Sequence, residues 1–241
     1  ELLSDVEFSS ALAAANIELR QVQGLTGNEN LSLQLDNAQL HHAQQLNEIE
    51  IIADDFIVSD IHSASNQSYA GDGVFNGTLY SNTGTIDIQQ ATINSALVLG
   101  DVSQQGQIVI DQLSNHGMLS SSASNFIIEL GNISGNGDIE LFNTNLVRIT
   151  GNSQLQQFTH NQGDTQLSGD LTISDQFVVD HLLLNNADVN VIGALQVQSM
   201  QSVGSNQLDL PSQTLSLNQL LLEDASQLSI AQLNLLQVNN P

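Results

Sequence analysis

Short stretches in which aliphatic and polar residues alternate recur along the whole chain, separated by polar groups that contain glycine. The clearest copies cover residues 81–88, 103–110 and 134–141, where a glycine and one further residue precede aliphatic residues at alternate positions. Side chains at i and i+2 lie on one face of a β-strand, so each copy predicts a short strand with one buried face. Asn-Gly, Ser-Gly and Gly-Asp groups between the copies supply the positive φ angles that sharp bends need.

The copies recur about every 20 residues. Gly84 and Gly106 mark one such interval, and Gly117 and Gly137 mark another of nearly the same length. A period of this length suits one coil of a parallel β-helix, with about three short strands and three corners. We therefore predict a single all-β domain over residues 1–241, a parallel β-solenoid of roughly twelve coils of about 20 residues. The glycines expected at structural turns are Gly84, Gly106, Gly137 and Gly169.

The composition favours this fold over a sandwich or a barrel, which regularly spaced short strands would also fit. Aromatic residues make up only 4% of the chain, and there is no Trp. Compact domains usually place large rings at the centre, because each ring buries a large area. An interior built from Leu, Ile, Val and Ala instead suits a narrow, repetitive core in which like residues stack on like.

The two ends of the chain follow the repeat less closely. Residues 9–19, with four alanines, predict either a short capping helix or a first strand-rich coil, and we assign residues 1–25 as the candidate cap. A cap would shield the unpaired strand edge that a solenoid otherwise exposes at its end. Residues 205–241 change to a Gln-Leu-x-Leu/Ile pattern and are expected to form variant C-terminal coils.

The charge balance excludes several functions. Arg20 and Arg148 are the only basic residues besides six His, and the formal net charge is −24. Two arginines cannot form the cationic patch that nucleic acid or an anionic membrane surface requires. No apolar run approaches the roughly 20 residues of a membrane-spanning helix, so we expect no membrane insertion. The absence of Cys excludes disulfides and thiol chemistry and fits an exported bacterial protein better than a disulfide-stapled secreted domain.

Uncharged amides take the place of the missing cations. The chain holds 25 Asn and 28 Gln. In stacked coils, like amides at equivalent corners can hydrogen-bond along the axis, whereas lysines at that spacing would repel one another. We therefore expect inward and corner amides to form ladders; the alternative is that they only keep the surface soluble.

Three segments resemble a known group of proteins. Residues 82–86 (NTGTI), 133–139 (ISGNGDI) and 167–173 (LSGDLTI) are similar in texture to the right-handed β-helices of secreted bacterial surface proteins. Filamentous-haemagglutinin-type exoproteins and autotransporter passengers are the nearest comparison, over about residues 70–200. The resemblance implies a right-handed β-helix exported from a Gram-negative cell, extracellular or at the cell surface, with a role in adhesion or assembly rather than catalysis.

The densest group of ionisable side chains lies between residues 48 and 62 and consists of Glu48, Glu50, Asp54, Asp55, Asp60 and His62. Carboxylates on adjacent coils can form a general acid/base pair, and oxygen-rich clusters can bind Ca²⁺. However, Glu48 and Glu50 alternate with isoleucines, which is typical of the solvated face of a strand. We expect neither a catalytic site nor a resident cofactor here. The calcium candidates are Asp54, Asp55, Asp60 and Asp72.

The histidines indicate no metal site. His41 and His42 are neighbours, so on a strand they point to opposite faces and cannot both bind one ion. His116, His160 and His181 stand alone in the sequence and are interpreted as turn or surface residues.

These features predict a non-enzymatic extracellular β-solenoid, either an adhesin stalk or a subunit of a surface fibre. Its expected partners are further copies of itself in a fibre, or a ligand on a host or cell surface. The alternative is a polysaccharide-active or carbohydrate-binding β-helix protein that uses the acidic cluster at 48–60. A third interpretation is a calcium-stabilised surface-layer component.

Overall fold

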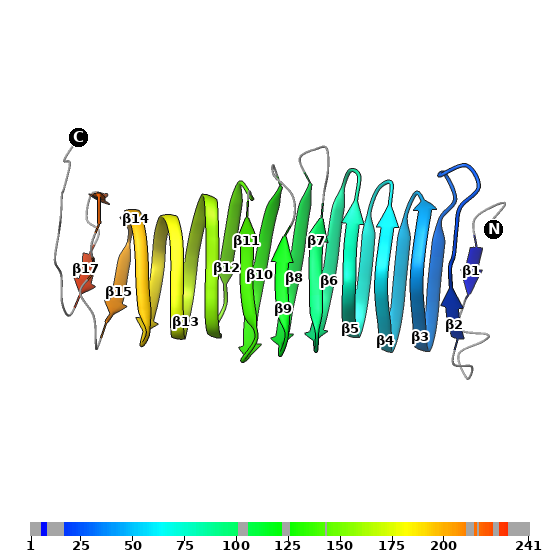
Figure 1. Cartoon of the computed structure of the whole chain (residues 1–241), viewed down its shortest axis with the longest axis horizontal. Helices are drawn as coiled ribbons and strands as arrows, with labels where there is room; N and C mark the ends of the chain where they lie inside the picture. The colour runs from blue at the N-terminus through cyan, green and yellow to red at the C-terminus, as the bar shows by residue number, and fades with distance from the viewer. Residues whose placement is uncertain are drawn as a thin grey trace.

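The computed structural model describes residues 6–8, 17–100, 106–121, 126–142, 144–210, 215, 217–223 and 227–230. Every strand pairing among them is parallel. The turns stack side by side along one axis, so the N-terminal and C-terminal strands lie at opposite ends of an elongated rod (Figure 1). The predicted parallel β-solenoid is confirmed.

Seventeen strands and no helix make up the described residues. The strands of the N-terminal half are β1 (Val6–Phe8), β2 (Ile17–Arg20), β3 (Leu31–Leu46), β4 (Ile49–Ser63), β5 (Gln67–Ser81), β6 (Thr85–Ile93), β7 (Ala96–Gly100), β8 (Gln107–Asn115) and β9 (Met118–Ser121). Those of the C-terminal half are β10 (Ile127–Gly135), β11 (Asp138–Phe142), β12 (Leu146–Thr150), β13 (Ser153–Val191), β14 (Ala194–Val203), β15 (Ser205–Asp209), β16 (Gln219–Leu222) and β17 (Gln227–Ile230).

The register between strands fixes the length of each turn. Leu31 pairs with Ile49 and Ile49 with Gln67, at equal intervals along the chain, whereas the turn that joins Thr85 to its partner Gln107 is longer. The fold has about 10 turns of about 19 residues. The described residues thus form fewer turns than the roughly twelve coils expected, a number that divided the whole chain, including ends that lie outside the described residues, by one uniform period.

Large apolar side chains, most of them aliphatic, form continuous rows inside the rod. Leu33, Ile51, Tyr69, Ile88 and Ile110 pair in register on successive turns, and all five are 0–1% exposed. Full burial of such a side chain contributes about 1.5–3 kcal/mol. The packing of the interior therefore depends on a large apolar residue recurring at the same position of each turn.

Aromatic side chains are few, but most of them gather in the core. Phe56 stacks on Tyr69 at 6.0 Å between ring centroids, and Phe75 meets both rings edge-on. Gln67 occupies an inward position in a row of aliphatic residues, where its Oε1 accepts a 2.9 Å hydrogen bond from the Tyr69 hydroxyl. Its Nε2 donates to the Ser63 hydroxyl. A polar side chain thus enters the core because a buried phenol needs a partner.

A recurring contact closes the corners, and we call it the corner clasp. An Asn or Asp side-chain oxygen accepts the backbone N–H of the residue 18–20 positions later, at 3.0–3.2 Å, and the residue before that N–H is glycine. A Cβ on each of these glycines would lie 2.2–2.4 Å from the accepting oxygen. The clasps are Asp60 with Gly77 and Thr78, Asn66 with Gly84 and Thr85, Asn132 with Gly151 and Asn152, and Asn186 with Gly204 and Ser205.

Amide-to-amide contacts also join turns. Asn47 Nδ2 donates to Asn30 Oδ1 at 3.0 Å, and Gln23 Nε2 donates to Gln45 Oε1 at 2.7 Å. Pairs of like amides therefore form between adjacent turns in these places. The corner clasps add a second use of the amide, as an acceptor for the backbone of the next turn.

Three of the four predicted turn glycines, Gly84, Gly106 and Gly137, directly precede strands β6, β8 and β11, whereas Gly169 lies within β13. Gly84 and Gly169 have φ angles of 101° and 110°, values that favour glycine. Gly137 donates its backbone N–H to Asn115 O, and a Cβ there would lie 2.4 Å from Gly117 O. Gly106 lies directly before β8, and its carbonyl accepts the N–H of Ile127.

In the N-terminal segment, residues 6–8 and 17–20 are strand. Ile17–Arg20 pairs with Ala38–His41, and Val6–Phe8 pairs with Leu31–Leu33. A helix extending to residue 19 is therefore wrong for residues 17–19, because their backbone groups pair with β3 instead. Residues 9–16, the rest of the helical expectation, lie outside the described residues. In the C-terminal segment, β15, β16 and β17 continue the parallel stacking, and residues 231–241 lie outside the described residues.

Substitution of Gly71 tests the stacking of the turns. Its φ is +114°, and a Cβ would lie 1.7 Å from Ala53 O, so Gly71→Ala should destabilise the fold by about 2 kcal/mol or more in urea unfolding. Gly27→Ala is the matched control: its φ is +77°, but nothing lies within 4 Å of the added Cβ. A loss of about 1–2 kcal/mol is expected there. Equal losses in both variants would contradict the close approach of adjacent turns at Gly71.

Candidate functional site

The predicted acidic cluster does not converge on one point. Glu50 lies on the outer side of β4 and accepts a 2.9 Å hydrogen bond from the Ser32 hydroxyl of the preceding turn. Glu48 lies before β4 and accepts one from Asn66 Nδ2 at 3.1 Å. Asp60 lies further along β4 with a φ of 56°, and it forms a corner clasp with the N–H of Thr78. These carboxylates therefore contact neighbouring turns rather than one another.

Two of the calcium candidates are close to each other. Asp55 pairs in register with Asp72 on the next turn, and Asp54 precedes Asp55 in the chain. Asp60 instead lies beside His42, whose Nδ1 is 3.3 Å from Asp60 Oδ2. Within the part of the chain that the structure describes, no group of three or more His, Asp or Glu side chains is arranged to hold a metal ion.

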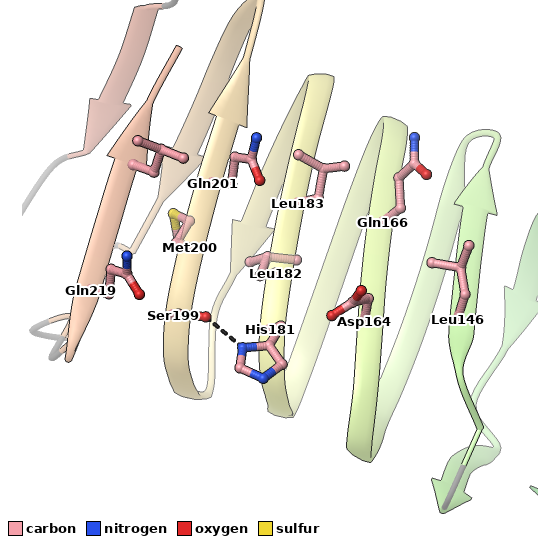
Figure 2. Close-up of a pocket in the computed structure, with 11 residues that line it drawn as sticks. Leu146, Asp164, Gln166, His181, Leu182, Leu183, Ser199, Met200, Gln201 and Gln219 are labelled. Carbon is pink, nitrogen blue, oxygen red and sulfur yellow. Dashed lines mark hydrogen bonds between the residues drawn. The ribbon is translucent and has the colours of Figure 1, made fainter. Parts of the chain in front are cut away.

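A serine–histidine pair lies on the outer face near the C-terminal end, in a groove of about 400 Å³ (Figure 2). His181 Nδ1 is 2.5 Å from Ser199 Oγ, and Asp164 lines the same groove. A nucleophilic triad needs the carboxylate to bind the second nitrogen of the imidazole. Among the ion pairs of the described residues, none joins Asp164 to His181.

The same pair recurs near the other end of the rod. His41 Nδ1 is 2.7 Å from Ser59 Oγ. Both pairs join residues in register on adjacent turns. A contact that repeats with the period of the fold is explained by stacking, so the geometry gives no reason to assign catalysis to either pair.

His160 is a buried residue within β13, although the sequence indicated a turn or surface position. Its side chain is 0% exposed, Nε2 lies 3.0 Å from Thr144 O and Nδ1 lies 2.8 Å from Thr165 Oγ1. Nε2–H donates to the carbonyl, so Nδ1 accepts from the hydroxyl when the ring is neutral. Thr144 Oγ1 continues the chain of polar contacts to Ser121 Oγ at 3.2 Å. The local sequence, rich in Asn, Gln and Gly, hid this position because its polar neighbours are also typical of turns.

Burial dominates the protonation of His160. It lowers the pKa of this imidazole below its ordinary value, although the hydrogen bond with Thr144 O and the charges of Asp180 and Asp164 raise it. The neutral ring is therefore the form that fits the interior.

A second buried ionisable residue, Glu29, closes a loop. Its side chain is 4% exposed and accepts hydrogen bonds from the Thr26 hydroxyl at 2.8 Å and from the backbone N–H groups of Thr26 and Gly27 at 3.0 Å. These contacts are local, and a Thr-x-x-Glu spacing is the only sequence signal for them. The carboxylate therefore holds the loop between β2 and β3.

Both arginines are engaged by carboxylates. Arg148 pairs with Glu129 on the preceding turn, and its Nε donates to Gln166 on the next at 3.4 Å. Arg20 pairs with Glu18 on the same strand. The net charge of the described surface is therefore carried mainly by carboxylates.

Comparison with protein-family models, curated proteins and solved structures finds no match to this chain. Among the described residues, no helix has the length and apolar character to cross a membrane. The fold is thus shown as a β-solenoid, while the likeness to bacterial surface proteins stays a prediction from the sequence.

The pH dependence of stability tests the buried imidazole. Because the pKa of His160 is lower in the folded state, the unfolded chain binds this proton first as the pH falls. The contribution of His160 to the free energy of unfolding is therefore complete at pH values above its pKa in the unfolded chain, about 6.5, and decreases as the pH falls below that pKa. In urea unfolding, His160→Gln, whose amide can replace both hydrogen bonds, should lose less stability than the wild type between pH 7 and 5.5. The exposed-residue control His181→Gln should behave like the wild type, and an unchanged pH dependence in His160→Gln would contradict the assignment.

Proposed function

We propose that this protein is a non-enzymatic structural or adhesive rod, a stalk or a fibre subunit at the surface of a Gram-negative bacterium. The observation that carries the proposal is where the polar side chains of the corners are used. Asp60, Asn66, Asn132 and Asn186 all bind the backbone of the next turn. A compact enzyme would gather such polar side chains in one active site. Here they are spread along the axis, and each of them joins two adjacent turns.

The composition supports a stiff rod that stays soluble. The net charge of −24 disfavours side-by-side clustering of rods at neutral pH, and both arginines are held by local carboxylates. The amide-rich outer surface supplies hydrogen bonds without attracting polyanions. These properties fit a scaffold exposed outside the cell, and the sequence resemblance to secreted β-helices agrees with them.

The alternative of a polysaccharide-active enzyme at residues 48–60 has less support. Glu48, Glu50 and Asp60 are engaged by other turns, and Asp55 and Asp72 form the only in-register carboxylate pair of that region within the described residues. Reducing-sugar release that disappears in Asp54→Asn/Asp55→Asn would nevertheless contradict the non-enzymatic proposal.

Imaging of the purified protein tests the scaffold function. With about 10 turns spaced about 4.8 Å apart, the described part of the chain should form a rod of roughly 48 Å. Negative-stain microscopy and solution scattering should find elongated particles at neutral pH. Single rods would favour a stalk and end-to-end filaments a fibre subunit, whereas a compact globular particle would contradict both.

A further inference from the structure

A groove of about 270 Å³ runs along the rod axis across the middle of the molecule, and we call it the axial groove. Five successive turns contribute to it. Asp72, Gln90, Gln112 and Asn132 pair in register along one wall. Asn152 extends this wall, since its backbone N–H binds Asn132 Oδ1 at 3.1 Å. At about 4.8 Å per turn, the wall is roughly 19 Å long.

The opposite wall carries hydroxyl groups. Thr92, Ser114 and Ser134 pair in register on three of the same turns. On each strand, the residue between the two walls points inward, as Ala91 does between Gln90 and Thr92, so the backbone forms the floor. Because the backbone N–H and C=O groups of these strands pair with adjacent turns, side chains supply the hydrogen-bonding groups that face the groove.

Several of these side chains are available to a ligand. Within the described part of the chain, Gln90, Thr92 and Gln112 have no hydrogen-bond partner for their side chains, and all three are at least partly exposed. Ser114 is held in place by His116, whose Nε2 lies 3.0 Å from its hydroxyl. The groove thus presents free amide and hydroxyl groups from positions that the stacking fixes.

The chemistry of the lining narrows the class of ligand. Asp72 is the only charged side chain among the lining residues, and none of them is aromatic. An apolar ligand would find amides and hydroxyls on both walls, and the net charge of −24 repels a polyanion. A neutral chain with hydroxyl groups at regular intervals along one axis could donate to and accept from both walls, turn after turn.

From this geometry we propose that the axial groove binds a linear neutral polysaccharide, which lies along the rod and across the strands. Each contact is a solvent-exposed hydrogen bond and is individually weak. Affinity would come from repetition over consecutive turns, since each further contact is intramolecular once the first has formed. The inference goes beyond the proposed scaffold function, because a rod can serve as a scaffold with or without a ligand in this groove.

Affinity electrophoresis in native gels tests the proposal. Purified protein is run at neutral pH in gels that contain soluble dextran, galactomannan, β-glucan or starch. At least one of these polysaccharides should retard the wild type, and added NaCl should not abolish the retardation because no ion pair is involved. Thr92→Ala/Gln112→Ala should weaken binding about tenfold, as expected for the loss of two hydrogen bonds.

The chain offers a closely matched control. Thr85 and Gln107 pair in register on the same two turns as Thr92 and Gln112, but they lie outside the axial groove. Thr85→Ala/Gln107→Ala should therefore bind like the wild type, and thermal melts should show that both variants fold. Retardation by none of the four polysaccharides, or an equal loss in both variants, would overturn the proposal. If binding fails while microscopy still shows rods, the scaffold function stands and only the ligand assignment is lost.

Discussion

Parallel hydrogen bonding between successive turns is the constraint on which the rest of the molecule depends. It holds neighbouring backbones about 4.8 Å apart and puts every residue beside its equivalent on the next turn. Which residue fits at a position therefore depends on the equivalent residues of the preceding and following turns as much as on its neighbours in the sequence. Apolar rows satisfy this condition inside the rod, as Leu33, Ile51 and Tyr69 on three successive turns illustrate.

The same constraint explains the partnership of amide and glycine. When turns lie this close, a corner side chain reaches the backbone of the next turn, and an N–H there gains an acceptor. The residue before that N–H faces the same oxygen, so only glycine leaves enough room, as at Gly77 above Asp60 and Gly84 above Asn66. At these corners, an Asn or Asp and a glycine are thus coupled across about one turn, and three of the amides have a structural role.

Charge is arranged around the stacking as well. Like charges in register repel by about 1 kcal/mol at this spacing in water, and more where water is excluded. The in-register pair Asp55 and Asp72 is tolerated at an exposed corner. Arg148 instead lies between Glu129 and Gln166, where it meets an opposite charge and an amide. Repulsion between turns therefore limits runs of one charge along the axis.

The sequence by itself determined the architecture, because alternation and a regular period are local patterns that any turn must satisfy. It also indicated Gly84, Gly106 and Gly137, which precede strands, and its composition limits the basic residues to two arginines and six histidines. The number of turns, the strand at residues 17–20 and the burial of His160 were decided by the tertiary structure. The two hydrogen-bond partners of the His160 imidazole are Thr144, which precedes it in the chain, and Thr165, which follows it. Only the stacking of turns brings both of them to the ring. In the axial groove, Gln90 likewise lies beside Gln112, and Thr92 beside Ser114, because of the register between adjacent strands. The number of residues per turn differs from turn to turn, so these neighbours cannot be found by counting along the chain.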